Sequence, residues 1–226
     1  MYYTIESFIN FCDDMQIVEE GFKDNIKKFG KAAWQGLLKA IKKLLEKIRD
    51  FRNKIRMRQN RDIKIETNWY KSFLGIEYFI EKGPTSMDPD AVDQWKKRIN
   101  SMKFDAKFDY YNFSKNKKDY TTTVRYRDVS QKVEKLSKRV NTLTNKIEEG
   151  QKKREALERE RANAKDEDQI NLINDKIESS SKFFNMNAKE LLICEYLYEI
   201  YAKLWELINS GKLEKTIQDI DYKIDD

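Results

Sequence analysis

Histidine is absent from the 226 residues of this sequence, and cysteine occurs only twice. Without histidine there are no His-based metal sites, no Ser-His-Asp or Cys-His arrangements, and none of the commonest general base near neutral pH. Cys12 and Cys194 lie far apart with no Cys-x-x-Cys spacing, which indicates neither a thiolate zinc site nor a disulfide framework and fits a reducing compartment. Phosphate loops, dinucleotide glycine fingerprints and nucleophile elbows are also missing from the sequence. We therefore expect no enzymatic activity, no cofactor and no metal site.

Residues that break regular structure are few, because the sequence holds only two prolines and seven glycines. Helices can therefore run far. Charged residues make up 37% of the sequence and apolar residues 39%, a balance typical of long exposed helices. No apolar run approaches the roughly eighteen residues of a membrane span, and the N-terminus lacks the basic start and apolar core of a signal peptide. The sequence predicts a mainly α protein that is made and kept in a cytoplasm.

The clearest pattern covers residues 22–61. Apolar residues recur there every three or four positions, as on one stripe of a long helix. These residues are Phe22, Ile26, Phe29, Ala33, Leu37, Ile41, Leu44, Ile48, Phe51 and Ile55. Fourteen Lys or Arg and three acids share the stretch, so its charge is 14 − 3 = +11, whereas the whole sequence is +6 and the remainder sums to −5. From Ile41 the apolar steps alternate between three and four, which predicts a partner helix from this chain or from another copy.

Two further helices and a hairpin are predicted next. Residues 69–80 keep helical spacing until Gly83-Pro84, and Asp88 is placed to cap a helix whose first residue is Pro89. Residues 104–127 combine aromatic and β-branched side chains around a polar turn, which predicts a small β-hairpin. The same residues interleave aromatic rings with Lys and Arg, the types that stack bases and neutralise phosphates in single-stranded nucleic acid.

A second long helix is predicted from Ser130 onward. Its apolar residues keep coiled-coil spacing; they are Val133, Leu136, Val140, Leu143 and Ile147. Gly150 and Arg154 then occupy positions where apolar residues are due, so we expect this later half to be exposed to solvent. The polar residues 164–168 predict the bend of an antiparallel helical hairpin.

The last predicted helix is the most apolar one. Asn187 is placed as its N-cap, with Glu190 three residues on as the reciprocal partner. Because this helix is apolar most of the way round, we expect it to be buried against the basic helix and the segment of residues 69–80. As domains, the sequence suggests a docking segment or propeptide (1–20), a body of the basic helix with helices and the hairpin (21–127), and the helical hairpin with the last helix and an acidic tail (128–226). We expect the last two to form one domain.

Four interpretations of the basic helix stay open at this point. It is a structural helix covered by the last helix, a surface for DNA or RNA phosphates, a helix that lies in a membrane surface, or a ligand for a groove on another protein. The candidate residues for a partner or nucleic acid are Lys39, Lys42, Lys43, Lys47, Arg49, Arg52 and Arg56. The candidate residues for a membrane or helix-packing face are Trp34, Leu37, Leu38, Ile41, Leu44 and Leu45.

The first sixty residues carry a resemblance. An aromatic and acidic start that ends in Glu19-Glu20-Gly21 is followed by the lysine-rich run KKFGKAAWQGLLKAIKKLLEKIRDF. This arrangement resembles the openings of small helical virion proteins of tailed bacteriophages. In some of these phages a prohead protease cuts after Leu/Ile-x-Glu, and Ile17-Val18-Glu19 matches that pattern. The resemblance implies that residues 1–19 are a propeptide, cleaved after Glu19.

The sequence thus predicts a non-enzymatic helical structural or interaction protein. The resemblance implies that it is a phage virion component, namely a capsid, tail or internal protein that uses the basic amphipathic helix for assembly and is packaged in a virion. Its expected partners are other protein chains, either further copies of itself or virion proteins, and we expect no small-molecule substrate. The alternatives are a nucleic-acid-binding protein and a membrane-surface-binding protein, each acting through the helix of residues 22–61.

Overall fold

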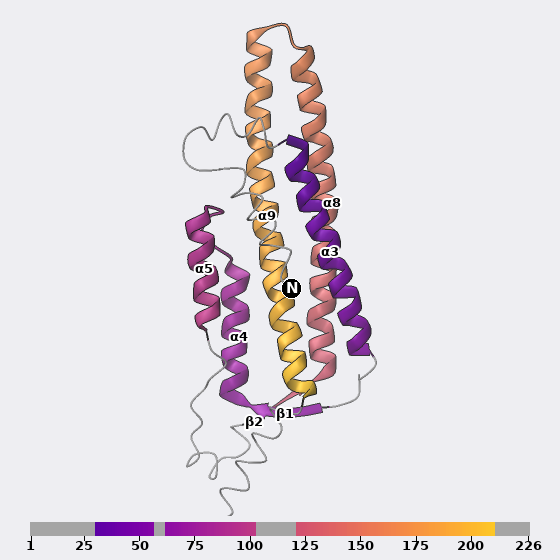
Figure 1. Ribbon diagram of the computed structural model, residues 1–226, viewed down its shortest axis with the longest axis vertical. Helices are drawn as coiled ribbons and strands as arrows, with labels where there is room; N and C mark the ends of the chain where they lie inside the picture. Colours follow the sequence, from indigo (N-terminus) through magenta and orange to yellow (C-terminus); the bar gives the residue numbers. More distant parts are fainter. Residues whose placement is uncertain (1–29, 57–61, 103–120, 211–226) are drawn as a thin grey trace, which may run out of the picture. The chain divides into compact units, whose positions relative to one another are not determined.

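The computed structural model describes residues 30–56, 62–102 and 121–210. These residues form five helices and two short strands (Figure 1). In chain order the elements are α3 (Gly30–Arg56), β1 (Asp62–Glu66), α4 (Thr67–Lys82), α5 (Pro89–Ser101), β2 (Thr121–Arg125), α8 (Tyr126–Asn163) and α9 (Glu167–Asn209). The predicted mainly α class with one small pair of strands is confirmed.

The chain divides into two compact units, and each unit combines separate stretches of sequence. Unit 1 consists of Met1–Lys47 and Lys138–Leu192, and unit 2 consists of Ile48–Ser137 and Ile193–Asp226. Helices α3, α8 and α9 are each divided between the two units, with one segment in unit 1 and one in unit 2. The division of the sequence at residues 20 and 127 stays a prediction, and residues 1–20 lie outside the described ranges.

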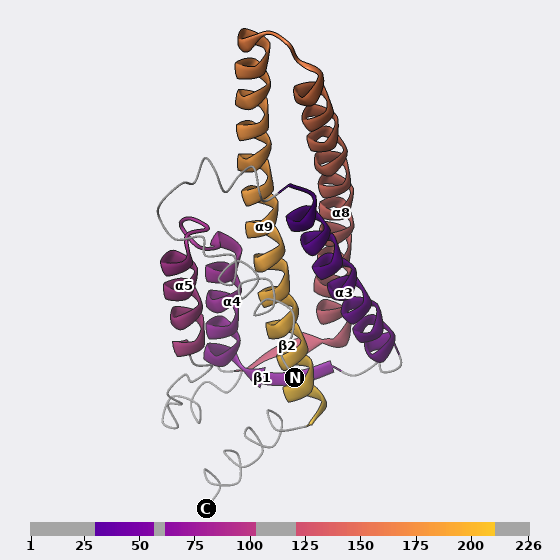
Figure 2. The same cartoon turned by 45° about the horizontal axis from the view of Figure 1, so that its top comes forward.

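In unit 1, α8 and α9 form an antiparallel helical hairpin (Figures 1 and 2). Helix α8 ends at Asn163 and α9 begins at Glu167, so the bend predicted for residues 164–168 is confirmed. The predicted coiled-coil positions of α8 in this part of the hairpin are buried, namely Val140, Leu143 and Ile147, and Ile173 and Ile177 of α9 are buried as well. An ion pair between Arg139 and Glu190 also joins the two helices. The apolar periodicity therefore fixes which sides of the two helices face each other.

The expected exposure of the later half of α8 was wrong at two positions. Gly150 is buried, and Arg154 is only 5% exposed. The Arg154 guanidinium donates hydrogen bonds to the Glu158 carboxylate (2.8 Å), the Ile177 carbonyl (3.5 Å) and the Ser181 hydroxyl (3.3 Å). A buried charge is tolerated when it is paired and hydrogen-bonded, so a cation in the seam does not force the helix into solvent.

The predicted N-cap at Asn187 was also wrong, because α9 runs unbroken through that position. Asn187 is 5% exposed, and its side-chain amide donates to the Phe183 carbonyl one turn earlier (2.7 Å). That bond is the pattern of an asparagine inside a helix rather than at its start. Helix α9 contains no glycine or proline over its 43 residues, so nothing in its backbone chemistry ends the helix before the apolar run.

In unit 2, β1 and β2 pair antiparallel, with Ile63 opposite Val124 and Ile65 opposite Thr122. Strand β2 falls in the predicted hairpin, but its partner is β1, which the sequence pattern did not assign to a strand. Residues 104–120, which hold the other predicted strand, lie outside the described ranges. Helix α4 follows β1 directly and α8 follows β2 directly, so the strand pair ties the starts of these two helices together.

The ends of α4 and α5 follow their turn residues. Gly83 adopts a φ of 65° and its amide donates to the Ile80 carbonyl (2.9 Å), a helix end that favours glycine. Pro89 is the first residue of α5 and Asp88 holds the N-cap position, as predicted. The Asp88 carboxylate makes no capping bond and instead accepts from the Ser86 hydroxyl.

The last part of α9 lies in the core of unit 2. Leu197 and Leu204 are 2% and 1% exposed. Phe51 of α3 packs edge to face on Tyr198 and Trp205, with centroid separations of 5.8 and 6.2 Å. Tyr201 likewise contacts Phe73 of α4 at 6.4 Å. The predicted packing of the last helix against the basic helix and against residues 69–80 is confirmed by these contacts.

Candidate interaction surface

The apolar stripe of α3 is buried within the protein's own fold. In unit 1, Trp34 is 3% exposed, Leu37 and Ile41 are 0% exposed, and Leu44 is 2% exposed. Leu38 and Leu45, the other two candidates for a membrane or helix-packing face, are half-buried. In unit 2 the stripe continues with buried Ile48, Phe51 and Ile55. Because helix packing already covers the stripe, it is not presented to an external partner.

Trp34 anchors the start of α3 in unit 1. Its ring stacks on Phe183 with centroids 6.5 Å apart and meets Phe184 edge to face at 5.0 Å. On the α8 side, a Cβ at Gly150 would lie 2.6 Å from the Trp34 Cη2 atom and 2.9 Å from the Phe183 Cε1 atom. Only glycine leaves room for the indole at this point. The Trp34 ring therefore occupies the space that a side chain at position 150 of α8 would fill, and we call this position the seat of Trp34.

Four lysines of α3 in unit 1 form the surface that we call the lysine face: Lys39, Lys42, Lys43 and Lys47, all exposed. With 3.6 residues per turn they span an arc of about 140°, on the side of the helix opposite to the buried stripe. One acid, exposed Glu46, shares that arc. The predicted lysines therefore do lie together on one side of the helix.

The predicted arginines belong to the part of α3 that lies in unit 2. Arg49 and Arg56 are exposed and Arg52 is half-exposed, with the i, i+3, i+7 spacing of a single helix row. The Arg49 Nε atom lies 3.9 Å from the Asp50 carboxylate, and both side chains are about 70% exposed. Such a pair is screened by water and contributes little to stability.

A polar cluster in unit 2 was not predicted. The Lys132 ammonium lies 2.6 and 2.7 Å from the two carboxylate oxygens of Glu77, and the Tyr201 hydroxyl donates to the same carboxylate at 2.5 Å. The ammonium also lies 5.9 Å from the Phe73 ring centroid and 5.7 Å from the Tyr201 centroid. The carboxylate thus has two donors and the ammonium two aromatic faces, an arrangement that holds α4, α8 and α9 together.

The tyrosine hydroxyls of unit 2 do not point to catalysis. Burial, followed by the Glu77 and Asp128 carboxylates, raises the pKa of Tyr70 above its ordinary value. Burial raises the pKa of Tyr196 and Tyr198 as well, with further contributions from neighbouring acids. A general base near neutral pH needs a pKa near the working pH, and these shifts move the hydroxyls away from it.

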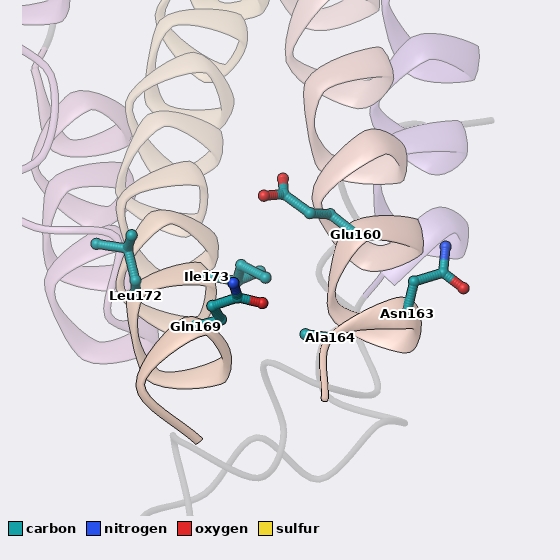
Figure 3. Close-up of a pocket in the computed structure, with 6 residues that line it drawn as sticks. All are labelled: Glu160, Asn163, Ala164, Gln169, Leu172 and Ile173. Atoms are coloured by element: carbon teal, nitrogen blue, oxygen red, sulfur yellow. The ribbon is translucent and has the colours of Figure 1, made fainter. Parts of the chain in front are cut away.

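A pocket lies at the tip of the hairpin in unit 1 (Figure 3). Six residues from the last turn of α8, the bend and the first turns of α9 line it; they are Glu160, Asn163, Ala164, Gln169, Leu172 and Ile173. Figure 3 shows the Glu160 carboxylate directed into the space between the helices and Leu172 on the outer side. The lining offers a single carboxylate and two amides, without a nucleophile and base pair of the kind that catalysis requires.

The described ranges hold neither a metal-binding cluster nor a membrane-spanning helix. Within residues 30–56, 62–102 and 121–210 there is no group of three or more Cys, Asp or Glu side chains placed to hold a metal ion. In the same ranges no helix combines the length and the apolar character that crossing a membrane demands. The possible cleavage position after Glu19 lies outside the described residues.

Sequence reasoning missed the seat of Trp34, the buried Arg154 and the Glu77 cluster. The first two had a signal, since a glycine and an arginine at successive seam positions of one helix are unusual in a solvated coiled coil. The third had none, because its three side chains come from three helices. No protein-family model, curated protein or solved structure matches this chain.

Proposed function

We propose that this chain is a non-enzymatic helical structural protein that acts by binding a partner through the exposed cations of α3. The observation that carries the proposal is the division of α3 into two sides. Its apolar stripe is used up in the internal packing of each unit, whereas the lysine face stays exposed. Side chains that are charged, exposed and gathered on one side of a helix are available to a partner without any rearrangement of the core.

The proposed setting is a phage virion, which the resemblance of the first sixty residues suggests. In that setting the chain is made in the cytoplasm and packaged, and the partners are other virion components. The described residues support an interaction role through their long helices and their charged surface. A membrane-surface role has less support, because it requires Trp34, Leu37, Ile41 and Leu44 to leave the core.

Quantitative mass spectrometry of purified virions tests the setting. The chain is expected in the particles at a fixed copy number, and its first peptide is expected to begin at Glu20 if the protease pattern at Ile17-Val18-Glu19 is used. Particles that lack the chain would overturn the virion setting. Particles in which Met1 is retained would overturn the propeptide while leaving the structural role in place.

Incorporation of variants tests the surface itself. Replacing the four residues of the lysine face by Glu should reduce the copy number in particles, because the partner then meets acids instead of cations. The matched control replaces Lys152, Lys153, Lys176 and Lys182 by Glu; these are exposed residues of α8 and α9 in the same unit. Equal incorporation of both variants would show that the lysine face is not the contact.

A further inference from the structure

The lysine face is dense for its length. Lys39 and Lys47 are eight residues apart, so the four ammonium groups are carried by about 12 Å of helix axis. Between Lys39 and Lys47 one acid, Glu46, lies on the same arc. The hairpin part of unit 1 is close to neutral: residues 138–192 hold twelve Lys or Arg and eleven Asp or Glu, a sum of 12 − 11 = +1. Among the residues of unit 1 that the structure describes, the excess of positive charge is therefore carried by α3.

The chemistry of this face selects among anionic partners. Lysine ammoniums are compact point charges on flexible stems, suited to phosphates whose positions vary. Duplex nucleic acid carries one phosphate charge per roughly 1.7 Å of its axis, or about seven over 12 Å. The lysine face itself holds no arginine and no amide, and Gln35 is the nearest amide, so its cations are lysines, which also serve as phosphate contacts. Such a surface binds the backbone and carries no sequence information.

A lipid surface fits this face less well. Helices that lie in a membrane insert an apolar side while their cations meet the headgroups. On α3 the apolar side chains that would insert, with Leu37 and Ile41 at their centre, are 0% exposed. Lysines without an insertable apolar side retain only the weak electrostatic part of membrane binding.

We propose that the lysine face binds the phosphate backbone of duplex nucleic acid without sequence preference. This inference rests on the proposed function, since it names the partner of the same surface. Binding is then dominated by release of counterions. If all four lysines reach phosphates, log K should fall with log salt at a slope of about −3.6, which is about a 150-fold loss of affinity between roughly 50 and 200 mM salt.

The experiment measures fluorescence anisotropy of a short labelled DNA duplex of mixed sequence, titrated with the full-length protein at several salt concentrations. Replacing Lys39, Lys42, Lys43 and Lys47 by Gln should weaken binding at low salt and flatten the slope by about three to four. The control replaces Lys152, Lys153, Lys176 and Lys182 by Gln. Both variants have a net charge of 6 − 4 = +2, and both must retain the wild-type circular dichroism and melting temperature.

The control is expected to keep most of the slope, because the duplex contacts lysines on α3 and not on the hairpin. An equal flattening in both variants would overturn the proposal, since bulk charge alone would then explain binding. Binding to vesicles of phosphatidylserine and phosphatidylcholine without binding to the duplex would overturn it as well. If the wild-type protein binds no duplex but the lysine-face variant is still lost from particles, the choice of nucleic acid as partner is refuted and the proposed function stands. If the lysine-face variant is incorporated into particles normally, the proposed function itself is refuted.

Discussion

Replacing Gly150 by Ala sets two opposing effects against each other inside α8. Alanine is the better helix former, and the exchange is worth up to about 1 kcal/mol in a helix interior. The added Cβ, however, would lie 2.6 Å and 2.9 Å from two atoms of the Trp34 indole and 2.9 Å from Phe183. The indole is 3% exposed and rigid, so it yields only by moving the start of α3.

Overpacking of this kind costs about 1 to 3 kcal/mol. The net expectation for Gly150→Ala is therefore a loss of about 0 to 2 kcal/mol in the free energy of unfolding, with the steric cost prevailing over the propensity gain. Gly36 in α3 is the matched control, because a Cβ there meets nothing within 4 Å. Gly36→Ala should stabilise the protein by about 0.5 to 1 kcal/mol.

Urea unfolding followed by circular dichroism gives the two free energies and tests their signs. A second background separates the indole contacts from backbone effects. Trp34→Phe removes both indole atoms that the new Cβ would meet and leaves the contact with Phe183, so Gly150→Ala should cost less in that background than in the wild type. If Gly150→Ala in the wild-type background stabilises as much as Gly36→Ala, the glycine is not the seat of the tryptophan and the reasoning fails.

Four further outcomes are expected. Arg154→Ala should cost about 1 to 3 kcal/mol by equilibrium unfolding, because it deletes a buried guanidinium and the hydrogen bonds that it donates to α9, whereas exposed Arg159→Ala should change stability by less than about 0.5 kcal/mol. Glu77→Gln should lower the melting temperature, since it removes the charge facing a part-buried ammonium, and a wild-type melt would contradict that pairing. Leu204→Ala should cost about 2 to 5 kcal/mol in the same assay. The pKa of Tyr196 is raised above 10.0 chiefly by burial, so above pH 10 the folded state keeps a proton that the unfolded chain loses. The free energy of unfolding of the wild type should therefore fall as pH rises above 10, by up to about 1.4 kcal/mol per pH unit for this group. Tyr196→Phe should show a less steep fall.

Periodicity was enough to predict the helical parts of this fold. The three-and-four spacing of the α3 stripe, and of Val133 to Ile147 in α8, placed the buried sides correctly because helix geometry converts spacing into direction. Gly83 and Pro89 marked helix ends that the structure confirms, since their backbone restrictions act locally.

Pairings between distant residues escaped prediction. Strand β1 is only five residues long, and its partner β2 begins 55 residues after β1 ends. No local sequence pattern therefore predicts that these two strands pair. Arg154 appeared to be a solvated charge because the Ile177 carbonyl and the Ser181 hydroxyl, which accept hydrogen bonds from it, lie on another helix. For the candidate surface, the exposure of the lysines could be predicted from their helical spacing relative to the apolar stripe. The burial of Trp34, by contrast, depends on a glycine more than a hundred residues later in the sequence.

The discontinuous make-up of unit 1 also has a consequence for biosynthesis. The ribosome completes the α3 segment at Lys47 and reaches the next segment of the same unit only at Lys138, which is 138 − 47 = 91 residues later. At translation rates of about 5 to 20 residues per second, roughly 5 to 20 s pass in between. During that interval the nascent chain carries a basic amphipathic stripe whose partners from α8 and α9 do not yet exist. We therefore expect the emerging polypeptide to expose an apolar stripe that chaperones can bind, and ribosome-bound chains halted before Lys138 are expected to sediment with chaperones until the hairpin is made.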